Sequence, residues 1–366
     1  MSLIQPRTAP PGAASQPNLV CRTLSAHEKS AYLEFAGKAW GTGSPQASAS
    51  FLAWLYQENP HALGMENDLL VVAAGDQIVG AHHRMRIPWR ISGQRVVVPS
   101  LHDLAILESH RHAEGQQRLI PPGAQLMLAA LQKEKHVALF GLNQIADNIY
   151  DRMKIPVVPV YWLRKVRSRI RAGMQAVAYR LQWTPGVRQT ARSVFSSRGF
   201  EVTKIASPSD DELDEALAVT PAAQTCLDWD RESFRWRFFH DAGPRNILLL
   251  ARKRSQPYGR AIISIGLKSG IVVARLVELV FQDTDSLKAL SSAMENTFSE
   301  LKVPVCLAVT SSQEAASHLV TEGWNYRKEP IGARWFTRKG EPRPEDFWIC
   351  GGAWDFGCDS RIEQPS

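Results

Sequence analysis

Hydrophobic and polar positions along the chain follow the same order twice. The first copy begins at residue 50 with "SFLAWLYQENPHALGMENDLLVVAAGDQIVGAHH", and the second begins at residue 233 with "SFRWRFFHDAGPRNILLLARKRSQPYGRAIIS". Each copy has an aromatic helix end, then a proline (Pro60 or Pro244), then two apolar strands around a turn. Because a repeated unit decides the architecture before any single motif does, this recurrence indicates a duplication.

The two copies continue in the same order. The apolar run "SLHDLAIL" corresponds to "ARLVELVF", and each run precedes an amphipathic pattern typical of a helix, over 124–135 and 286–301. A further strand and helix follow as "VALFGLNQIADNIYDRMKI" and "VCLAVTSSQEAASHLVTEGW". This order predicts two α+β units, over 20–162 and 200–345, each with a mixed central sheet flanked by helices. The alternative is a chance similarity between ordinary strand and helix segments.

The segment between the units, 163–199, is strongly basic and has no Asp or Glu between Leu163 and Arg198. Removing its nine basic residues from the net charge of +7 leaves the rest of the chain at −2. We expect a helical connector with a solvated face, or a surface for an acidic carrier protein, an anionic membrane or a nucleotide. Aromatic residues are sparse there, which argues against nucleic acid. The nine residues are Arg164, Lys165, Arg167, Arg169, Arg171, Arg180, Arg188, Arg192 and Arg198.

Length and composition are those of a globular protein. A chain of 366 residues fits two domains of common size. No apolar run approaches the roughly 18–20 residues that span a bilayer, and residues 1–19 lack the apolar core of a signal peptide. We therefore expect a disordered N-terminal tail and a cytoplasmic protein. The five cysteines are widely spread without a C-x-x-C pair, so neither a disulfide framework nor a metal site is expected.

The stretch "HRHAEGQQRLIPPGAQLMLAAL", His110 to Leu131, predicts a loop between a buried strand and a helix. Free N–H groups in the first turn of such a helix commonly hold phosphate. Pro121 and Pro122 fall in that turn and cannot donate, although proline suits the start of a helix. Arg111, Arg118, His110 and His112 could supply charge in place of backbone donors. Two interpretations stay open, namely a rebuilt phosphate site and a loop with another purpose.

With these motifs the chain resembles the GNAT (GCN5-type N-acetyltransferase) superfamily, duplicated in tandem over about 20–162 and 200–340. The family joins a strand, a phosphate loop of the form (Q/R)-x-x-G-x-(G/A), a helix, a strand and a helix opening N-x-x-A-x-x-x-Y-x-x-x-G-(F/W). Asn143, Ala146 and Tyr150 match the last pattern, although Lys154 replaces its glycine.

The second copy departs further from that pattern. The register set by "GW" at 323–324 places Ser312, Ala315 and Leu319 at the N, A and Y positions, so the tyrosine is lost. The phosphate loop of the first copy matches in neither register. Counting back from the helix, Arg118 and Gly123 keep the spacing, whereas counting forward from the strand leaves one residue too many between Arg111 and Gly115.

The resemblance implies transfer of an acyl group from acyl-CoA to an amine, with the first unit as the catalytic one and the second structural or substrate-shaping. Family chemistry places donor groups beside the thioester and uses a base for the amine and an acid for the thiolate. By this resemblance Tyr150 is the acid and Asn143 supports the site. The donor site would comprise Asp103, Leu104, Ala105, Ile106, Leu107, Arg111, Gly115, Arg118, Gly123 and Ala124.

The base is not decided by the sequence. His102 and Asp103 lie next to each other on the central strand, and successive strand residues point to opposite faces, so we expect only one to reach the cleft. His82 and His83 on the preceding strand present the same choice. For all four, a purely structural hydrogen-bonded role is the alternative.

The C-terminal tail, 346–366, contains "DFWICGGAWDFGCD" with Asp346, Asp355 and Asp359. It resembles an aromatic and acidic tail found in tandem GNAT proteins of exopolysaccharide and cell-envelope settings. The implied acceptor is an amino sugar, and the alternative is a tail strand that packs on a domain. Two other functions stay open, a non-catalytic GNAT-fold binding protein and an acyltransferase whose donor is acyl carrier protein.

Overall fold

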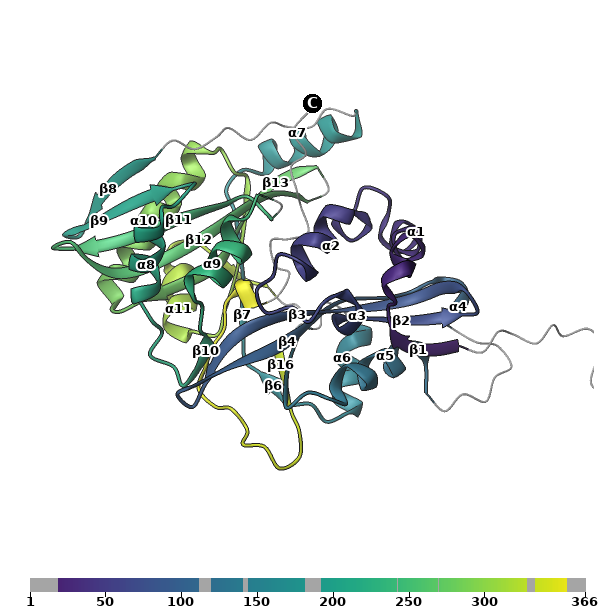
Figure 1. The fold of residues 1–366 in the computed structure, drawn as a ribbon. Coiled ribbons are helices and arrows are strands. Elements are labelled where there is room, and N and C mark those ends of the chain that lie inside the picture. Colours follow the sequence, from purple (N-terminus) through teal and green to yellow (C-terminus); the bar gives the residue numbers. More distant parts are fainter. Residues whose placement is uncertain are drawn as a thin grey trace, which may run out of the picture.

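Two mixed β-sheets, each flanked by helices, make up the protein in a computed structural model (Figure 1). The structure describes residues 19–111, 120–140, 144–181, 192–241, 243–268, 270–327 and 333–353, and only the backbone of 144–146. In its described part, no helix is long and apolar enough to cross a membrane.

The first sheet is antiparallel except where β4 pairs with β5, and where β10 pairs with β17 beside it. Its order is β1 (Leu19–Thr23), β2 (Leu69–Ala74), β3 (Gln77–Ile91), β4 (Gln94–Ile106), β5 (His136–Phe140), β16 (Ala333–Thr337) and β6 (Val157–Val158). The short strand β10 (Thr225–Leu227) pairs with β3, and β17 (Phe347–Trp348) pairs with β10.

Helices cover both faces of this sheet because apolar side chains along its strands point alternately to one face and to the other. On β2, Leu69 and Val71 pack toward α1 (Lys29–Trp40) and α2 (Ala49–Tyr56), whereas Leu70 and Val72 pack toward α5 (Pro122–Leu131) and α6 (Gln144–Arg152). Four shorter helices complete the unit, namely η1 (Ala26–Glu28), η2 (Pro45–Ala47), α3 (Met65–Asp68) and α4 (Glu108–Arg111).

The second sheet repeats this plan. Its order is β15 (Asn325–Tyr326), β7 (Tyr161–Val166), β14 (Val305–Thr310), β13 (Ile271–Phe281), β12 (Gln256–Lys268), β11 (Asn246–Lys253), β9 (Phe200–Ile205) and β8 (Ser193–Ser197). Helices α8 (Asp210–Ala218) and α9 (Arg231–Phe239) pack on one face, and α10 (Thr284–Glu300) and α11 (Gln313–Thr321) pack on the other. Beyond these lie α7 (Arg169–Arg180) and η3 (Gly351–Ala353).

The two halves exchange a strand. β7 follows the first half in sequence but pairs antiparallel with β14, from Tyr161 opposite Thr310 to Val166 opposite Val305. In return, β16 from the second half pairs with β5, from Ala333 opposite Phe140 to Thr337 opposite His136. Each half therefore supplies a strand that the sheet of the other half requires.

This exchange corrects two expectations. The boundary expected near 162 falls inside β7, and the described residues of the helical connector expected over 163–199 are helical only at Arg169–Arg180, with β7 before it and β8 after it. The physical reason is that Trp162 and Leu163 are buried in the second sheet, which makes this basic stretch a strand. The duplication and the mixed sheets flanked by helices are confirmed.

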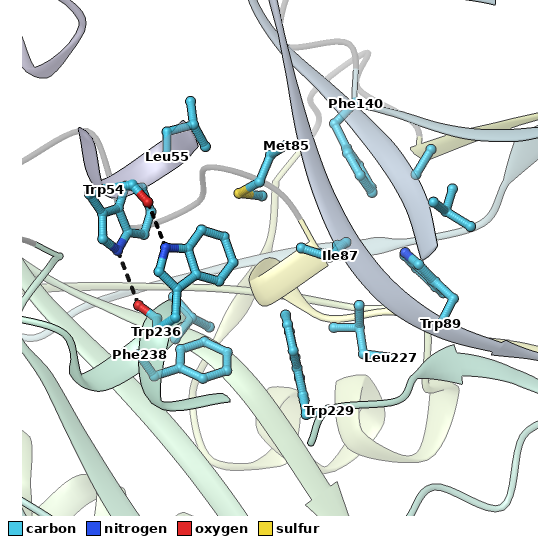
Figure 2. Packing of buried hydrophobic residues seen from close by; sticks show 14 of the residues in the cluster. Trp54, Leu55, Met85, Ile87, Trp89, Phe140, Leu227, Trp229, Trp236 and Phe238 are labelled. Carbon is cyan, nitrogen blue, oxygen red and sulfur yellow. Dashed lines mark hydrogen bonds between the residues drawn. The ribbon is translucent and has the colours of Figure 1, made fainter. Parts of the chain in front are cut away.

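A shared hydrophobic core joins the two units (Figure 2). Trp54 of α2 and Trp236 of α9 stack with ring centroids 5.1 Å apart. Each indole also donates a hydrogen bond to the backbone carbonyl of the other, at 3.1 Å from Trp54 and 2.7 Å from Trp236. These reciprocal contacts bury apolar area from both halves in one cluster, so the units are not independent of each other.

Candidate active site

Strands β4 and β5 separate after a short pairing. Among the described residues they are paired only at Ser100 with Ala138 and at Leu101 with Leu139, and β4 continues to Ile106 without a described partner on that side. A cavity of about 960 Å³ opens at this point. Its wall consists of β4, the beginning of α5, the end of α1, and residues of α6.

A β-bulge places two successive polar residues in this cavity. The register between β3 and β4 shifts between Ala81 and His83, and Asp103 adopts a left-handed φ of 52°. The bulge interrupts the alternation of side chains. Both His102 and Asp103 therefore line the cavity, and His102 Nδ1 lies 3.0 Å from Asp103 Oδ2. The expectation that only one of them faces the cleft is wrong.

His102 and Asp103 form a hydrogen-bonded pair in which the carboxylate is ionised. Burial alone would raise the pKa of Asp103, but interactions that include the hydrogen bonds from His102 and Gln46 outweigh it and lower the pKa to about 2. With the carboxylate ionised, His102 Nδ1 carries the proton and Nε2 is the accepting nitrogen. Among the described residues, Nε2 has no hydrogen-bond partner. This arrangement suits a general base.

His83 supports His102 from behind. The two imidazoles stack with centroids 5.3 Å apart, and His83 lies 2.7 Å from both the Tyr32 hydroxyl and the Tyr56 hydroxyl. Burial lowers the pKa of His83 to about 3 and raises the pKa of both tyrosines. The layer behind His102 is thus neutral at ordinary pH and held in place by hydrogen bonds.

His82 takes the other direction from its strand and lines the cavity. Burial lowers its pKa to about 3, so it is neutral. Its Nδ1 has no hydrogen-bond partner in the described part of the chain. A polar buried atom of this kind is suited to a bound molecule or water. Of the two neighbouring histidines, His82 thus lines the cavity, whereas His83 stacks on His102.

Helix α5 presents its first turn to the cavity, as expected. Pro121 is its N-cap, and the Gln125 N–H donates to the Pro121 carbonyl at 3.0 Å. The N–H groups of Gly123 and Ala124 precede that bond and have no acceptor within the helix. Both residues line the cavity. The two prolines therefore leave two backbone donors at this end of the site.

Two arginines line the same cavity. Arg111 at the end of α4 donates from Nε to the Ile106 carbonyl at 3.0 Å, which ties its side chain to the end of β4. Arg152 comes from the last turn of α6. With the α5 donors, they make this end of the cavity suitable for an anion.

Tyr150 lines the cavity from α6 and is buried. Burial raises its pKa, so the phenol keeps its proton at neutral pH. The Arg334 guanidinium lies 5.8 Å from its ring centroid and bonds to Asp147 and Asp151 at 2.7 and 2.6 Å. Arg334 belongs to β16, so the exchanged strand positions the helix that carries Tyr150.

The end of α6 explains a departure from the family motif. Lys154, which replaces the family's glycine, has a φ of 56°. Its N–H bonds to the Asp151 carbonyl, and the Ile155 N–H bonds to the Tyr150 carbonyl. In the second unit, Gly323 has a φ of 86°. Its N–H bonds to the Val320 carbonyl, and the Trp324 N–H bonds to the Leu319 carbonyl, so the same two bonds are present. The matching caps support the register that aligns Tyr150 with Leu319.

Most predicted site residues lie together. His102, Asp103, Leu104, Ala105, Ile106, Arg111, Gly123, Ala124 and Tyr150 all line the cavity. Leu107 does not, because its N–H bonds to the Val79 carbonyl and its side chain packs against the core. Asn143, Gly115 and Arg118 lie outside the described residues.

Sequence reasoning missed other parts of the wall. Ala39 and Trp40 come from the end of α1, and Phe140 comes from the end of β5. Arg152 was also missed, although it lies only two residues after Tyr150. Nothing in the sequence places the end of α1 beside β4, because that contact depends on the tertiary fold.

The corresponding opening in the second sheet is filled by the chain itself. β13 and β14 pair only from Val273 with Val305 to Leu276 with Ala308. Beyond them, the Trp348 indole donates to the Leu279 carbonyl at 3.0 Å, and Cys350 bridges to Thr310. Residues Phe347–Trp348 and Gly351–Ala353 thus occupy the place that is a cavity in the first unit.

The described part of the C-terminal tail is structural. Asp346 Oδ2 accepts from the Gln224 N–H at 3.1 Å, and Trp348 bonds to the second sheet. This agrees with the alternative of a tail that packs on a domain. Asp355 and Asp359 lie outside the described residues.

No protein-family model matches the sequence, and no curated protein matches it. The structure is similar to a GCN5-related N-acetyltransferase from Anabaena variabilis, with a TM-score of 0.52, 12% identity, and coverage of 87% of this chain and 72% of that one. It is also similar to Saccharomyces cerevisiae N-myristoyltransferase with bound myristoyl-CoA, with a TM-score of 0.56, 10% identity, and coverage of 91% and 87%. The chain therefore has the GNAT fold in two tandem units, and at these identities the likeness establishes the fold alone.

Proposed function

We propose that the protein transfers an acyl group from acyl-CoA to an amine, with its active site in the first unit. The observation that carries this proposal is the His102 and Asp103 pair, which lines a cavity of about 960 Å³ at the strand opening and leaves His102 Nε2 without a hydrogen-bond partner among the described residues. Support comes from the structural neighbours, which include N-acetyltransferases and a myristoyl-CoA complex of N-myristoyltransferase.

The donor lies along the unpaired edge of β4. Backbone groups from Asp103 to Ile106 hold the pantetheine arm and polarise the thioester carbonyl, since no strand in the described part of the chain pairs with them on that side. The phosphates lie against the N–H groups of Gly123 and Ala124, with Arg111 and Arg152 adding charge. Gly115 and Arg118 stay part of the proposal on the family pattern alone.

Each protonation step has a group suited to it. His102 Nε2 takes a proton from the attacking amine as the new C–N bond forms. Asp103 stabilises the resulting imidazolium through Nδ1. As the C–S bond breaks, the Tyr150 hydroxyl protonates the leaving thiolate. The amide product and free CoA then leave, and a proton returns from His102 to Tyr150 through solvent.

The acceptor is an amine. The amino sugar implied by the C-terminal sequence gains no support from Asp346 or Trp348, because both bond to backbone groups of the protein. A panel of amines that includes amino sugars, amino acids and peptide N-termini therefore provides the first test. Acyl carrier protein, charged with the same acyl group, provides the test of the alternative donor.

His102→Gln is the decisive substitution for the proposed chemistry. Glutamine has a polar side chain of similar size but cannot accept a proton, so turnover should fall about 10²- to 10⁴-fold. Free thiol release measures turnover, and calorimetry should show unchanged acyl-CoA affinity. His27→Gln, at an exposed position outside the cavity, is the matched control. Wild-type turnover in His102→Gln would remove His102 as the base, and binding without transfer to any amine would favour a non-catalytic binding protein.

A further inference from the structure

Helix α7 carries an exposed apolar stripe. Ile170, Met174, Val177 and Leu181 follow at intervals of four, three and four, which places them on one side of the helix. They are 80%, 67%, 58% and 76% exposed, respectively. Isolated exposed apolar residues are normal, but a continuous stripe marks an interaction surface.

The opposite side of α7 holds the helix on the second sheet. The Gln175 side chain accepts from the Val272 N–H at 3.0 Å, and Arg171 donates to the Lys302 carbonyl at 3.1 Å. Tyr179 packs so closely on Gly270 that a Cβ there would lie 2.2 Å from Tyr179 Cβ. The orientation of α7 beside β13 is therefore fixed (Figure 1), and the helical period places the stripe on the side away from Gln175 and Tyr179.

Two arginines border the stripe. By the helical period of about 100° per residue, Arg169 and Arg180 fall on one flank, whereas Arg171 falls toward the other, where its guanidinium donates to the Lys302 carbonyl. All three are exposed, and the sequence has no Asp or Glu from 163 to 198. Before the helix, basic side chains of the same segment are held by an ion pair with the second unit, since Lys165 and Arg167 pair with Glu295 at 2.8 and 3.2 Å. The basic segment is thus not uniformly free, because part of it pairs with an acidic residue of the second unit.

We propose that α7 docks the protein on an anionic phospholipid surface. Apolar side chains flanked by arginines are the pattern of a helix that lies in the plane of the interface, with its stripe among the acyl chains and its arginines at the phosphates. A helix of 12 residues is too short to span a bilayer but long enough to lie on one. The positive flanks complement negative lipid, whereas four bare aliphatic side chains give an acidic protein or nucleotide no hydrogen-bond partner.

Vesicle sedimentation of the full chain tests this proposal. Phosphatidylcholine vesicles with and without phosphatidylserine are compared at low and high salt. Arg169→Gln with Arg180→Gln should weaken binding to the anionic vesicles by roughly fivefold per arginine, or about thirtyfold for the pair. Ile170→Ser with Met174→Ser should reduce binding at both salt concentrations, because the apolar contribution is not screened.

Matched controls are Arg254→Gln with Arg343→Gln, and Leu63→Ser with Val194→Ser, which change exposed residues outside α7. They should bind as the wild type does, and thermal unfolding should show every variant to be folded. The proposal would be overturned if the wild type did not bind the anionic vesicles at low salt, or if both α7 variants bound them as tightly as the wild type does. So would light scattering that reveals a dimer broken by Ile170→Ser with Met174→Ser, or binding to acyl carrier protein without binding to vesicles.

Discussion

Two buried neutral histidines make stability depend on pH. Burial lowers the pKa of His82 and of His83 to about 3, against an ordinary value of 6.5. Between these values the unfolded chain binds more protons than the folded chain, so stability rises with pH there. The stabilisation is complete above about pH 6.5 and is lost progressively as the pH falls toward 3.

We therefore expect the free energy of unfolding to fall below about pH 6.5, at up to ~1.4 kcal/mol per pH unit for each histidine. Urea denaturation at a series of pH values measures this slope. His83→Gln should lower the overall stability. It should also reduce the slope of the free energy of unfolding against pH by up to ~1.4 kcal/mol per pH unit, the contribution of one proton. The range between pH 6 and 4 lies between the ordinary pKa of 6.5 and the pKa of about 3 in the folded chain. A free energy of unfolding that stays constant over this range would show that these histidines are not buried as described.

Lys154 is a second residue whose conformation can be tested. It ends α6 with a φ of 56°, which costs a residue with a Cβ about 1 kcal/mol. Lys154→Gly should therefore stabilise the protein by ~1 kcal/mol, measured by urea denaturation. Lys133→Gly, at an exposed position outside the regular turns of α5, is the control and should not stabilise. Destabilisation by Lys154→Gly would place the end of α6, and with it Tyr150, in another register.

At the scale of elements, the C-terminal segment is what closes the second unit. A Cβ on Gly352 would lie 2.9 Å from Phe238 Cζ and 3.3 Å from the Val277 carbonyl. Gly352→Ala should thus destabilise the protein by about 1–3 kcal/mol through overpacking. Acyl transfer should stay within a small factor of the wild type, because this segment lies outside the first cavity.

Gly43→Ala is the matched control for that substitution, since nothing lies within 4 Å of a Cβ at Gly43. Urea denaturation should place it within about 0.5 kcal/mol of the wild type. Equal stability of Gly352→Ala and the wild type would indicate that the segment does not pack in the opening between β13 and β14.

The elements also show how far sequence patterns reach. Alternating apolar residues and amphipathic helices predicted the order of strands and helices in both halves, because burial of one face imposes those periods. The bulge at Asp103 was not predictable, since it depends on the pairing of β3 with β4 and not on local preference. As a result, most residues expected at the site line one cavity, whereas the contact between His102 and Asp103 was not expected.

At the scale of the molecule, strand exchange makes the halves one folding unit. β7 and β16 each complete the sheet of the other half, and Trp54 and Trp236 bond across the shared core. The sequence could not reveal this exchange, because either edge satisfies the hydrogen bonds of a strand equally well. The expected boundary at 162 was wrong for that reason.

We predict a single cooperative unfolding transition for the whole chain. Trp54→Ala should destabilise this transition by about 3–5 kcal/mol without splitting it, since the indole is buried in the core that both units share. Circular dichroism and tryptophan fluorescence in denaturant measure it. Leu63→Ala, at a residue that is 57% exposed, should change stability little. Two separate transitions would show that the units fold independently.

Titration calorimetry with an acyl-CoA tests the central claim most directly, namely that the first opening binds the donor and the second is filled. We predict one molecule bound per chain. Arg111→Ala should weaken that binding by about tenfold or more, because a charge-assisted contact to phosphate contributes about 1.5–3 kcal/mol. Arg343→Ala, at an exposed position away from the cavity, should bind as the wild type does. No heat of binding, two molecules per chain, or an unchanged affinity in Arg111→Ala would contradict the claim.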